Sequence, residues 1–168
     1  MNPRTINREV VMPLSRLSEY LDEHDKKYVV VKHSKAFTAQ EVAASAHIPG
    51  KDMAKTVMVK VDGELKMVVL PSTHQVSFDR IRDVTGADEV ELATEDEFES
   101  LFPDCELGAM PPFGNLYDME TIVAESLTED EEIAFNAGTH KELIKLAYRD
   151  FEELVQPKIM PIGIRQPV

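Results

Sequence analysis

The sequence has few of the residues that stabilise small proteins through covalent or aromatic contacts. Its 168 residues include one cysteine, no tryptophan and 7% aromatic residues. The single thiol, Cys105, cannot form an internal disulfide, and no apolar run reaches the about 20 residues of a membrane-spanning helix. The N-terminus lacks the apolar segment of a secretion signal. The single thiol and the absence of these apolar segments therefore favour a soluble cytoplasmic protein. Because 43% of the residues are apolar, we expect a globular chain that folds as one domain over residues 1–168.

The motifs of several enzyme classes are absent too. The sequence has no Walker loop, no glycine-rich dinucleotide motif and no nucleophile elbow. Its five histidines lie too far apart in the sequence to form a local metal motif. Between Phe102 and Leu107, Cys105 is interpreted as a packing residue rather than a nucleophile. We therefore predict no metal and no cofactor.

The net charge of −13 is distributed unevenly along the chain. Residues 1–84 carry 13 basic and 11 acidic side chains, whereas residues 85–168 carry 5 basic and 20 acidic ones. Such an acidic protein does not attract a polyanion through its global charge, so a nucleic-acid partner needs a local basic patch. The first half supplies candidates for that patch, although surface lysines also serve solubility alone: Lys32, Lys35, Lys51, Lys55, Lys60 and Lys66.

The apolar patterns predict short helices mixed with short strands. Helical spacing predicts helices near residues 13–25, 38–46, 77–85, 94–102 and 150–154. Thr38 and Thr94 open capping boxes, Ser77 is an N-cap and Gly86 ends the third helix. Runs of β-branched and apolar residues predict strands at 28–33, 54–61, 65–71, 89–92, 121–125, 132–136 and 143–147, the first of them buried.

Turn residues predict how these strands connect. Asp62-Gly63 between two strands indicates a hairpin, because both central turn residues need a positive φ. We expect 121–125 and 132–136 to form an antiparallel pair and 137–140 to be a tight turn. The proline-rich tail from Pro157 either lies on the surface or serves an interface. Short helices interspersed with hairpins favour an α+β fold with a mixed, strongly curved sheet.

The stretch 108–115 is a stiff apolar loop. Its prolines and glycines exclude a helix or a central strand, because proline fixes φ and donates no backbone hydrogen bond. One interpretation is a surface loop that covers the core. The other is the wall of a binding pocket, in which prolines hold the backbone still and glycines let a ligand approach closely.

Two further segments have both a structural and a functional interpretation. Lys55 begins an apolar strand, so its ammonium group either reaches solvent or points into a cleft, where it would bind a phosphate or a hydroxyl. Gly138-Thr139-His140 follows a strand, where backbone N–H groups can converge on an anion. In that case His140 would donate a hydrogen bond to a carbonyl or orient a water molecule. In the structural interpretation, Thr139 only caps a turn.

Taken together, these residues resemble a known family. Four motifs occur in one order: His33 with Thr38-Ala39-Gln40-Glu41, then Ala54-Lys55-Thr56, then Gly108 with Pro112-Phe113-Gly114, and then Asn136-Ala137-Gly138-Thr139-His140. In this arrangement the chain resembles the YbaK/prolyl-tRNA synthetase-associated editing domain over about residues 26–156. The resemblance implies an α+β fold with a curved, mixed, mostly antiparallel and barrel-like sheet flanked by helices.

The resemblance also implies an activity and a site. The family hydrolyses mischarged tRNA without a protein nucleophile or a metal, by positioning the ester. It implies that Lys55 lies near the terminal adenosine, that Gly108 to Pro112 form the GxxxP loop beside the aminoacyl group, and that 138–140 form the GxH loop. Lys55, Gly138 and His140 are the implied catalytic residues. Met110, Phe113 and either Met53 or Met58 would set the pocket size. The implied substrate-binding residues are His33, Thr38, Gly108, Met110, Pro112, Phe113, Gly114, Asn136 and Thr139.

Two functions remain open. The first is a freestanding trans-editing deacylase for mischarged tRNA, with alanine or cysteine on tRNA(Pro) and the acceptor end as the partner. The second is a non-catalytic module that binds tRNA or a protein, which the charge of −13 and the unusual tail favour. The extension before about residue 25, the tail after Gln156 and the acidic second half depart from the family pattern. Whether the tail builds a homodimer is left open.

Overall fold

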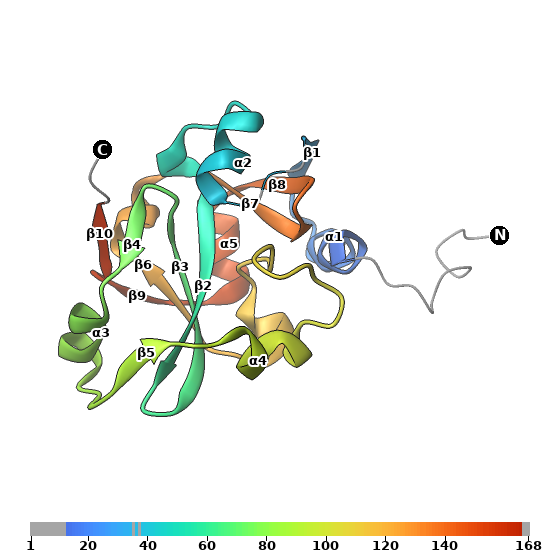
Figure 1. The fold of residues 1–168 in the computed structure, drawn as a ribbon. Helices are drawn as coiled ribbons and strands as arrows, with labels where there is room; N and C mark the ends of the chain where they lie inside the picture. Colours follow the sequence, from blue (N-terminus) through green and yellow to red (C-terminus); the bar gives the residue numbers. More distant parts are fainter. Residues whose placement is uncertain (1–12, 35, 37, 166–168) are drawn as a thin grey trace.

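The structure is a computed structural model that describes residues 13–34, 36 and 38–165. Its strands form three sheets (Figure 1). The largest has the strand order β5 (Val90–Leu92), β2 (Ala54–Val61), β3 (Glu64–Pro71), β6 (Thr121–Ala124) and β9 (Lys158–Met160). The second has the order β1 (Tyr28–Lys32), β8 (Glu142–Ala147) and β7 (Glu132–Thr139). The third pairs β10 (Gly163–Arg165) with β4 (His74–Val76).

Five α-helices are described around these sheets: α1 (Pro13–Glu23), α2 (Ala39–Ser45), α3 (Phe78–Thr85), α4 (Glu95–Phe98) and α5 (Tyr148–Val155). Short 3-10 turns lie at η2 (Gly50–Asp52), η3 (Glu99–Leu101), η4 (Gly114–Tyr117) and η5 (Glu125–Glu129). Figure 1 shows α1 and α2 near the three-stranded sheet, with α3 and β10 at the opposite edge of the molecule. None of the helices in the described part is long and apolar enough to cross a membrane.

Most of the predicted elements are confirmed, together with the α+β class. The β2–β3 hairpin turns at Asp62 and Gly63, which have φ of 49° and 85°. Thr38 caps α2 in a capping box with Glu41, and Gly86 ends α3 in the left-handed region. The sheet is mixed, because β6 pairs in parallel with both β3 and β9. Over the described residues the strands form three separate sheets rather than a closed barrel.

Three predictions about strands and turns are corrected. β1 is an edge strand with Val29 56% exposed, not a buried strand. β6 and β7 lie in different sheets rather than forming an antiparallel pair. The predicted turn at 137–140 belongs largely to β7, whose pairing with β8 is irregular between Asn136 and Thr139. The tail, which was expected to lie on the surface or to serve an interface, forms the mostly exposed strands β9 and β10, which join two of the sheets. Lys35 and residues 1–12 lie outside the described residues.

An aromatic cluster lies at the centre of the largest group of buried residues. The ring of Phe113 is fully buried, with its centroid 5.4 Å from that of Phe135 and 5.5 Å from that of Phe151. Leu17 and Leu21 on α1 are buried in the same cluster. The loop 108–115 and the N-terminal helix are therefore both anchored in the core.

A carboxylate pair lies where the two larger sheets meet. Met53 and Ala134 form a parallel bridge just after Asp52 and a few residues beyond Asp130. Lys51 Nζ lies 3.2 Å from Asp52 Oδ1 and 3.9 Å from Asp130 Oδ1. Burial and the neighbouring Asp52 carboxylate raise the pKa of Asp130 to about 6, although Lys51 opposes this shift. Asp130 thus retains its proton at a higher pH in the folded chain than a free aspartate does.

This shift makes the folding stability depend on pH. Between the ordinary pKa of 3.8 and about 6, the folded chain binds a proton that the unfolded chain has released. Stability therefore falls as the pH rises through this window and stays lowered above it. We expect the substitution Asp130→Asn to raise the free energy of unfolding by about 1 kcal/mol at pH 7.5, after allowance for solvent screening, and not at pH 4. Urea unfolding at the two pH values measures both effects.

The matched control is Asp83→Asn, which changes an exposed carboxylate on α3. It should leave the free energy of unfolding nearly unchanged at both pH values. A gain for Asp130→Asn that is equal at pH 4 and pH 7.5 would contradict the proposed proton linkage.

Candidate functional site

A small cavity opens where α2, β2, β7 and the loop of residues 102–113 come together. Its volume is about 150 Å³, and its lining residues are Ala39, Ala54, Lys55, Thr56, Gly108, Met110 and Asn136. Figure 1 shows the loop, in yellow, beside β2 and β7. Four of the residues expected at the site therefore line one cavity: Lys55, Gly108, Met110 and Asn136. Ala39, Ala54 and Thr56 were not predicted, although each belongs to a quoted motif.

Lys55 provides an uncompensated positive charge at this cavity. The side chain is half-buried, and it has no hydrogen bond or ion pair with the described residues. Burial lowers the pKa of its ammonium group. A half-buried cation is stabilised when an anion or a strong acceptor binds beside it. Lys55 is thus suited to hold a phosphate or hydroxyl oxygen of a ligand.

The other lysines of the predicted basic patch differ from Lys55. Lys51, Lys60 and Lys66 each lie within 3.2 Å of a carboxylate oxygen, so their charges are compensated within the chain. Lys32 is exposed on β1. These positions do not form one continuous patch with Lys55.

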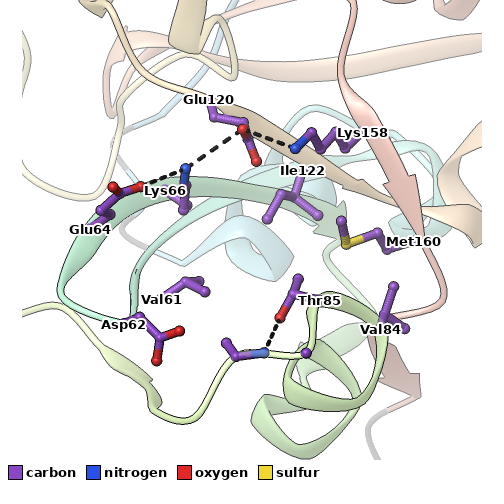
Figure 2. A pocket seen from close by; sticks show the side chains of 12 residues that line it. Val61, Asp62, Glu64, Lys66, Val84, Thr85, Glu120, Ile122, Lys158 and Met160 are labelled. Carbon is purple, nitrogen blue, oxygen red and sulfur yellow. Dashed lines mark hydrogen bonds and ion pairs between the residues drawn. The ribbon is translucent and has the colours of Figure 1, made fainter.

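A larger groove at the other end of the β2–β3 hairpin has a different character (Figure 2). Its volume is about 540 Å³, and both of its lysines contact Glu120: Lys66 Nζ lies 3.6 Å and Lys158 Nζ 3.2 Å from Glu120 Oε2. Lys55 and Val61 are six residues apart on β2, so the groove lies about 20 Å from the cavity. Because the cations of the groove are neutralised, the smaller cavity is the better candidate site.

Asn136 lines the cavity and carries a buried acceptor without a partner among the described residues. Its side chain is 8% exposed, and its Oδ1 has no hydrogen-bond partner among the described residues. An unsatisfied buried polar atom costs about 1–3 kcal/mol, which a ligand donor would recover. An ammonium or hydroxyl group of a bound ligand is such a donor. The residues that line the cavity therefore include a cation on β2 and a residue with an unsatisfied acceptor on β7.

Gly138 holds the loop against β7 through two backbone hydrogen bonds. Its N–H donates to the carbonyl of Ala109 at 2.9 Å, and its carbonyl accepts from the N–H of Glu106 at 2.8 Å. The N–H of His140 donates to Glu106 Oε2 at 3.1 Å. The sequence suggested that N–H groups of 138–140 converge on an anion, but the structure gives these two N–H groups partners within the chain. They position the loop that carries Gly108 and Met110.

His140 connects the same loop to the β7–β8 turn. Its ring is 6% exposed, and Nε2 donates to the carbonyl of Leu107 at 2.8 Å. Gly108 has a φ of 83°, and a Cβ at that position would lie 3.5 Å from His140 Cε1. The left-handed backbone conformation, rather than a lack of space, therefore favours glycine here. His140 is placed to fix the loop rather than to line the cavity.

Three further expected residues make contacts within the chain. Thr38 caps α2, and the Thr139 hydroxyl donates to Glu142 Oε1 at 3.3 Å. His33 Nδ1 donates to the carbonyl of Ser34 at 2.7 Å, while its Nε2 is buried without a partner among the described residues. None of these three residues lines the cavity.

Pro112, Phe113 and Gly114, in the second half of the loop 108–115, are buried and also do not line the cavity. A Cβ on Gly114 would come within 2.6 Å of the Met119 carbonyl oxygen, so close packing requires glycine there. Met53 and Met58 are core residues, so Met110 is the methionine at the cavity.

Among the described residues, neither the cysteine nor a metal cluster provides a further reactive group at the site. Burial raises the pKa of the Cys105 thiol to about 11, and Sγ lies 3.4 Å from the Tyr117 hydroxyl. Such a thiol is a poor nucleophile at neutral pH. Within the described part of the chain, no three His, Cys, Asp or Glu side chains are grouped so that they could hold a metal ion.

Comparison with known proteins relates this site to a family. The model of the aminoacyl-tRNA editing domain matches residues 33–154, which include every residue that lines the cavity. The chain belongs to the aminoacyl-tRNA editing domain family. The resemblance drawn from the four motifs is thereby confirmed.

Curated relatives include the proline-tRNA ligases of Bacillus mycoides strain KBAB4 and Bacillus cytotoxicus strain DSM 22905. They are 33% and 34% identical to this chain over 101 residues. The aligned part is 60% of this chain and 18% of each ligase. The chain thus spans less than a fifth of the ligases it matches.

Solved structures share the fold. The crystal structure of hypothetical protein APE2540 has a TM-score of 0.79 and 18% identity, and the match covers 89% of this chain and 99% of that one. A structure described as a proposed trans-editing enzyme for prolyl-tRNA synthetase has a TM-score of 0.77 and 16% identity, and the match covers 92% of this chain and 98% of that one. At these identities the likeness establishes the editing-domain fold.

The hydrogen bond from His140 to the loop can be tested by hydrogen exchange. We expect His140→Ala to remove the donor to Leu107 and to leave that carbonyl poorly satisfied, which lowers the free energy of unfolding by about 1–3 kcal/mol. The amides of Glu106, Ala109 and Gly138 should then exchange faster, because the loop opens more often.

The control for this variant is His24→Ala, which changes an exposed histidine on the N-terminal side of β1. Exchange at the three loop amides should stay at the wild-type rate in that variant. Unchanged exchange in His140→Ala would show that His140 does not hold the loop.

Proposed function

We propose that the chain is an aminoacyl-tRNA deacylase that hydrolyses the ester of a mischarged tRNA. The observation that carries the proposal is the pairing of two unsatisfied groups at one cavity, the Lys55 ammonium and Asn136 Oδ1. Membership of the aminoacyl-tRNA editing domain family supports a substrate that ends in an aminoacyl ester. In this arrangement Lys55 binds the oxygens of the terminal nucleotide and Asn136 accepts a hydrogen bond from the α-ammonium group.

The reaction is a simple hydrolysis. Water attacks the ester carbonyl carbon, the bond from that carbon to the ribose oxygen breaks, and a proton from the water restores the ribose hydroxyl. The products are a free amino acid and an uncharged tRNA. The side chains lining the cavity hold the ester in place and keep its charges compensated. Gly138 and His140 act through the loop they fix, so we assign them as positioning residues.

The size of the cavity suggests the substrate. A volume of about 150 Å³ suits a small side chain such as that of alanine or cysteine. Met110 forms part of the wall, and each methylene that a pocket excludes contributes about 1–3 kcal/mol to discrimination. Because proline-tRNA ligases are among the relatives of this chain, we propose tRNA(Pro) as the carrier. A larger aminoacyl group would have to displace Met110 or the loop.

A non-catalytic tRNA-binding module is the second candidate. One observation favours it, since Lys55 is the only residue with an ionisable side chain among those that line the cavity. A binding module needs no general base. The two candidates differ in whether a bound aminoacyl ester is consumed.

Single-turnover deacylation separates the two functions. The panel is alanyl-, cysteinyl-, seryl- and prolyl-tRNA(Pro) at low salt, with wild type and with Lys55→Ala. We expect the wild type to hydrolyse one small aminoacyl ester and to spare prolyl-tRNA. Lys55→Ala should lower the rate by about 100-fold or more, because the substrate loses its main electrostatic contact. Its stability should not fall, because the half-buried ammonium has no partner to lose.

The matched control is Lys27→Ala, an exposed lysine directly before β1. It removes the same charge and should keep the wild-type rate. A folded Lys55→Ala variant with the wild-type rate would remove Lys55 from the site. Tight binding of the panel without turnover by the wild type would favour the binding module.

A further inference from the structure

The C-terminal strand brings a second cation toward the Lys55 side of the molecule. Arg165 on β10 lies opposite His74 on β4 in the antiparallel register. β4 follows β3 after a two-residue turn, and Leu70 near the end of β3 lies opposite Lys55 on β2. Three segments far apart in the sequence thus carry Lys55, His74 and Arg165 along one end of the sheets.

The tail that carries Arg165 is firmly attached. Ile162 is fully buried, and its carbonyl accepts from the N–H of Ser77 at 2.9 Å. Arg80 Nη1 donates to the carbonyl of Gly163 at 3.0 Å. A Cβ on Gly163 would lie 3.4 Å from His74 Cδ2, so the two strands pack closely. Arg165 therefore has a defined place, although it lies beyond the residues 33–154 that match the editing-domain model.

The positive charges of Lys55 and Arg165 are not compensated within the described part of the chain. Arg165, like Lys55, has no ion pair or hydrogen bond with the residues described. Burial, and then the positive charges of Arg165 and Lys55, lower the pKa of His74. His74 Nδ1 lies 3.0 Å from the Thr73 hydroxyl. His74 also borders a cavity of about 240 Å³ whose lining residues include Arg80, Glu125 and Glu129, but the neighbouring charges that shift its pKa are both positive.

We propose that Arg165 and His74, together with Lys55, bind the phosphodiester groups of the single-stranded 3′ end of tRNA. The proposal rests on the proposed function, because it places the terminal nucleotide in the Lys55 cavity. Two uncompensated cations, Lys55 and Arg165, together with the His74 imidazole as a hydrogen-bonding group, are suited to follow a nucleic-acid backbone that leaves this cavity. In a chain with a net charge of −13, binding of a polyanion requires such a local patch.

The experiment measures binding of an acceptor-stem RNA hairpin that ends in an unpaired CCA and carries no amino acid. The variant Arg165→Gln is compared with Arg149→Gln, which removes the same charge from an exposed position. Arg149 lies two residues after Ala147, which pairs with Glu132 at the start of β7. His140 directly follows Thr139 at the opposite end of β7. The length of β7 therefore places Arg149 about 20 Å from His140.

We expect Arg165→Gln to weaken binding about three- to tenfold at low salt. The slope of log Kd against log salt should become shallower by about 0.7, the value for one phosphate contact on a single strand. Arg165→Lys should keep most of the slope because it keeps the charge. Arg149→Gln should match the wild type in both affinity and slope.

Other results would overturn the proposal. Equal behaviour of Arg165→Gln and Arg149→Gln would remove Arg165 from the RNA site. An equal loss of affinity for a hairpin that lacks the CCA end would exclude the single-stranded 3′ end as the group recognised. Because the RNA carries no amino acid, these binding results are independent of deacylation, which the tRNA panel tests separately.

Discussion

The backbone pairing between the loop and the end of β7 is the constraint on which the site depends. Two hydrogen bonds join Gly138 to Glu106 and Ala109, and the ring of His140 bonds to the Leu107 carbonyl. Below the loop, the fully buried Phe113 anchors it in the aromatic core. The cavity wall formed by Gly108 and Met110 is thus held from both sides. A wall fixed in this way can select small ligands, because it does not move aside without a cost in hydrogen bonds and packing.

The second constraint on the site is the pairing of its charges. Most of the described lysines are compensated by carboxylates, as in the groove of Figure 2, where Lys66 and Lys158 both contact Glu120. Lys55 and Arg165 have no such partners among the described residues. The net charge of the chain is therefore a poor guide to what the site attracts. A few uncompensated cations near a cavity determine the local potential, since paired charges largely cancel.

The sequence predicted what depends on local chemistry. The Asp62-Gly63 turn, the Thr38 and Thr94 capping boxes and the glycine at the end of α3 are all confirmed, because each depends on residues a few positions apart. Pairing between distant segments was harder to predict. β6 is short and apolar, and nothing in its sequence shows that its partners are β3 and β9 rather than β7. The tail has little periodicity because its two strands have only three residues each.

Part of the candidate site could also be predicted from the sequence. Lys55, Gly108, Met110 and Asn136 do share a cavity. Phe113 and Gly114 belong to the same motif as Gly108, but they lie in the core rather than at the cavity. The space available inside the fold determines which residues fit there, and the sequence does not show it. Arg165 gave no signal in the sequence, because its position depends on the pairing of β10 with β4.

The most direct test of the account is the structure of the protein bound to a stable analogue, an adenosine whose 3′ position carries alanine through an amide. We expect the alanyl group to occupy the cavity, with its ammonium within hydrogen-bond distance of Asn136 Oδ1 and with Lys55 Nζ at the oxygens of the nucleoside. An analogue bound in the groove of Lys66 and Glu120, or bound with its alanyl group outside the cavity, would contradict the account.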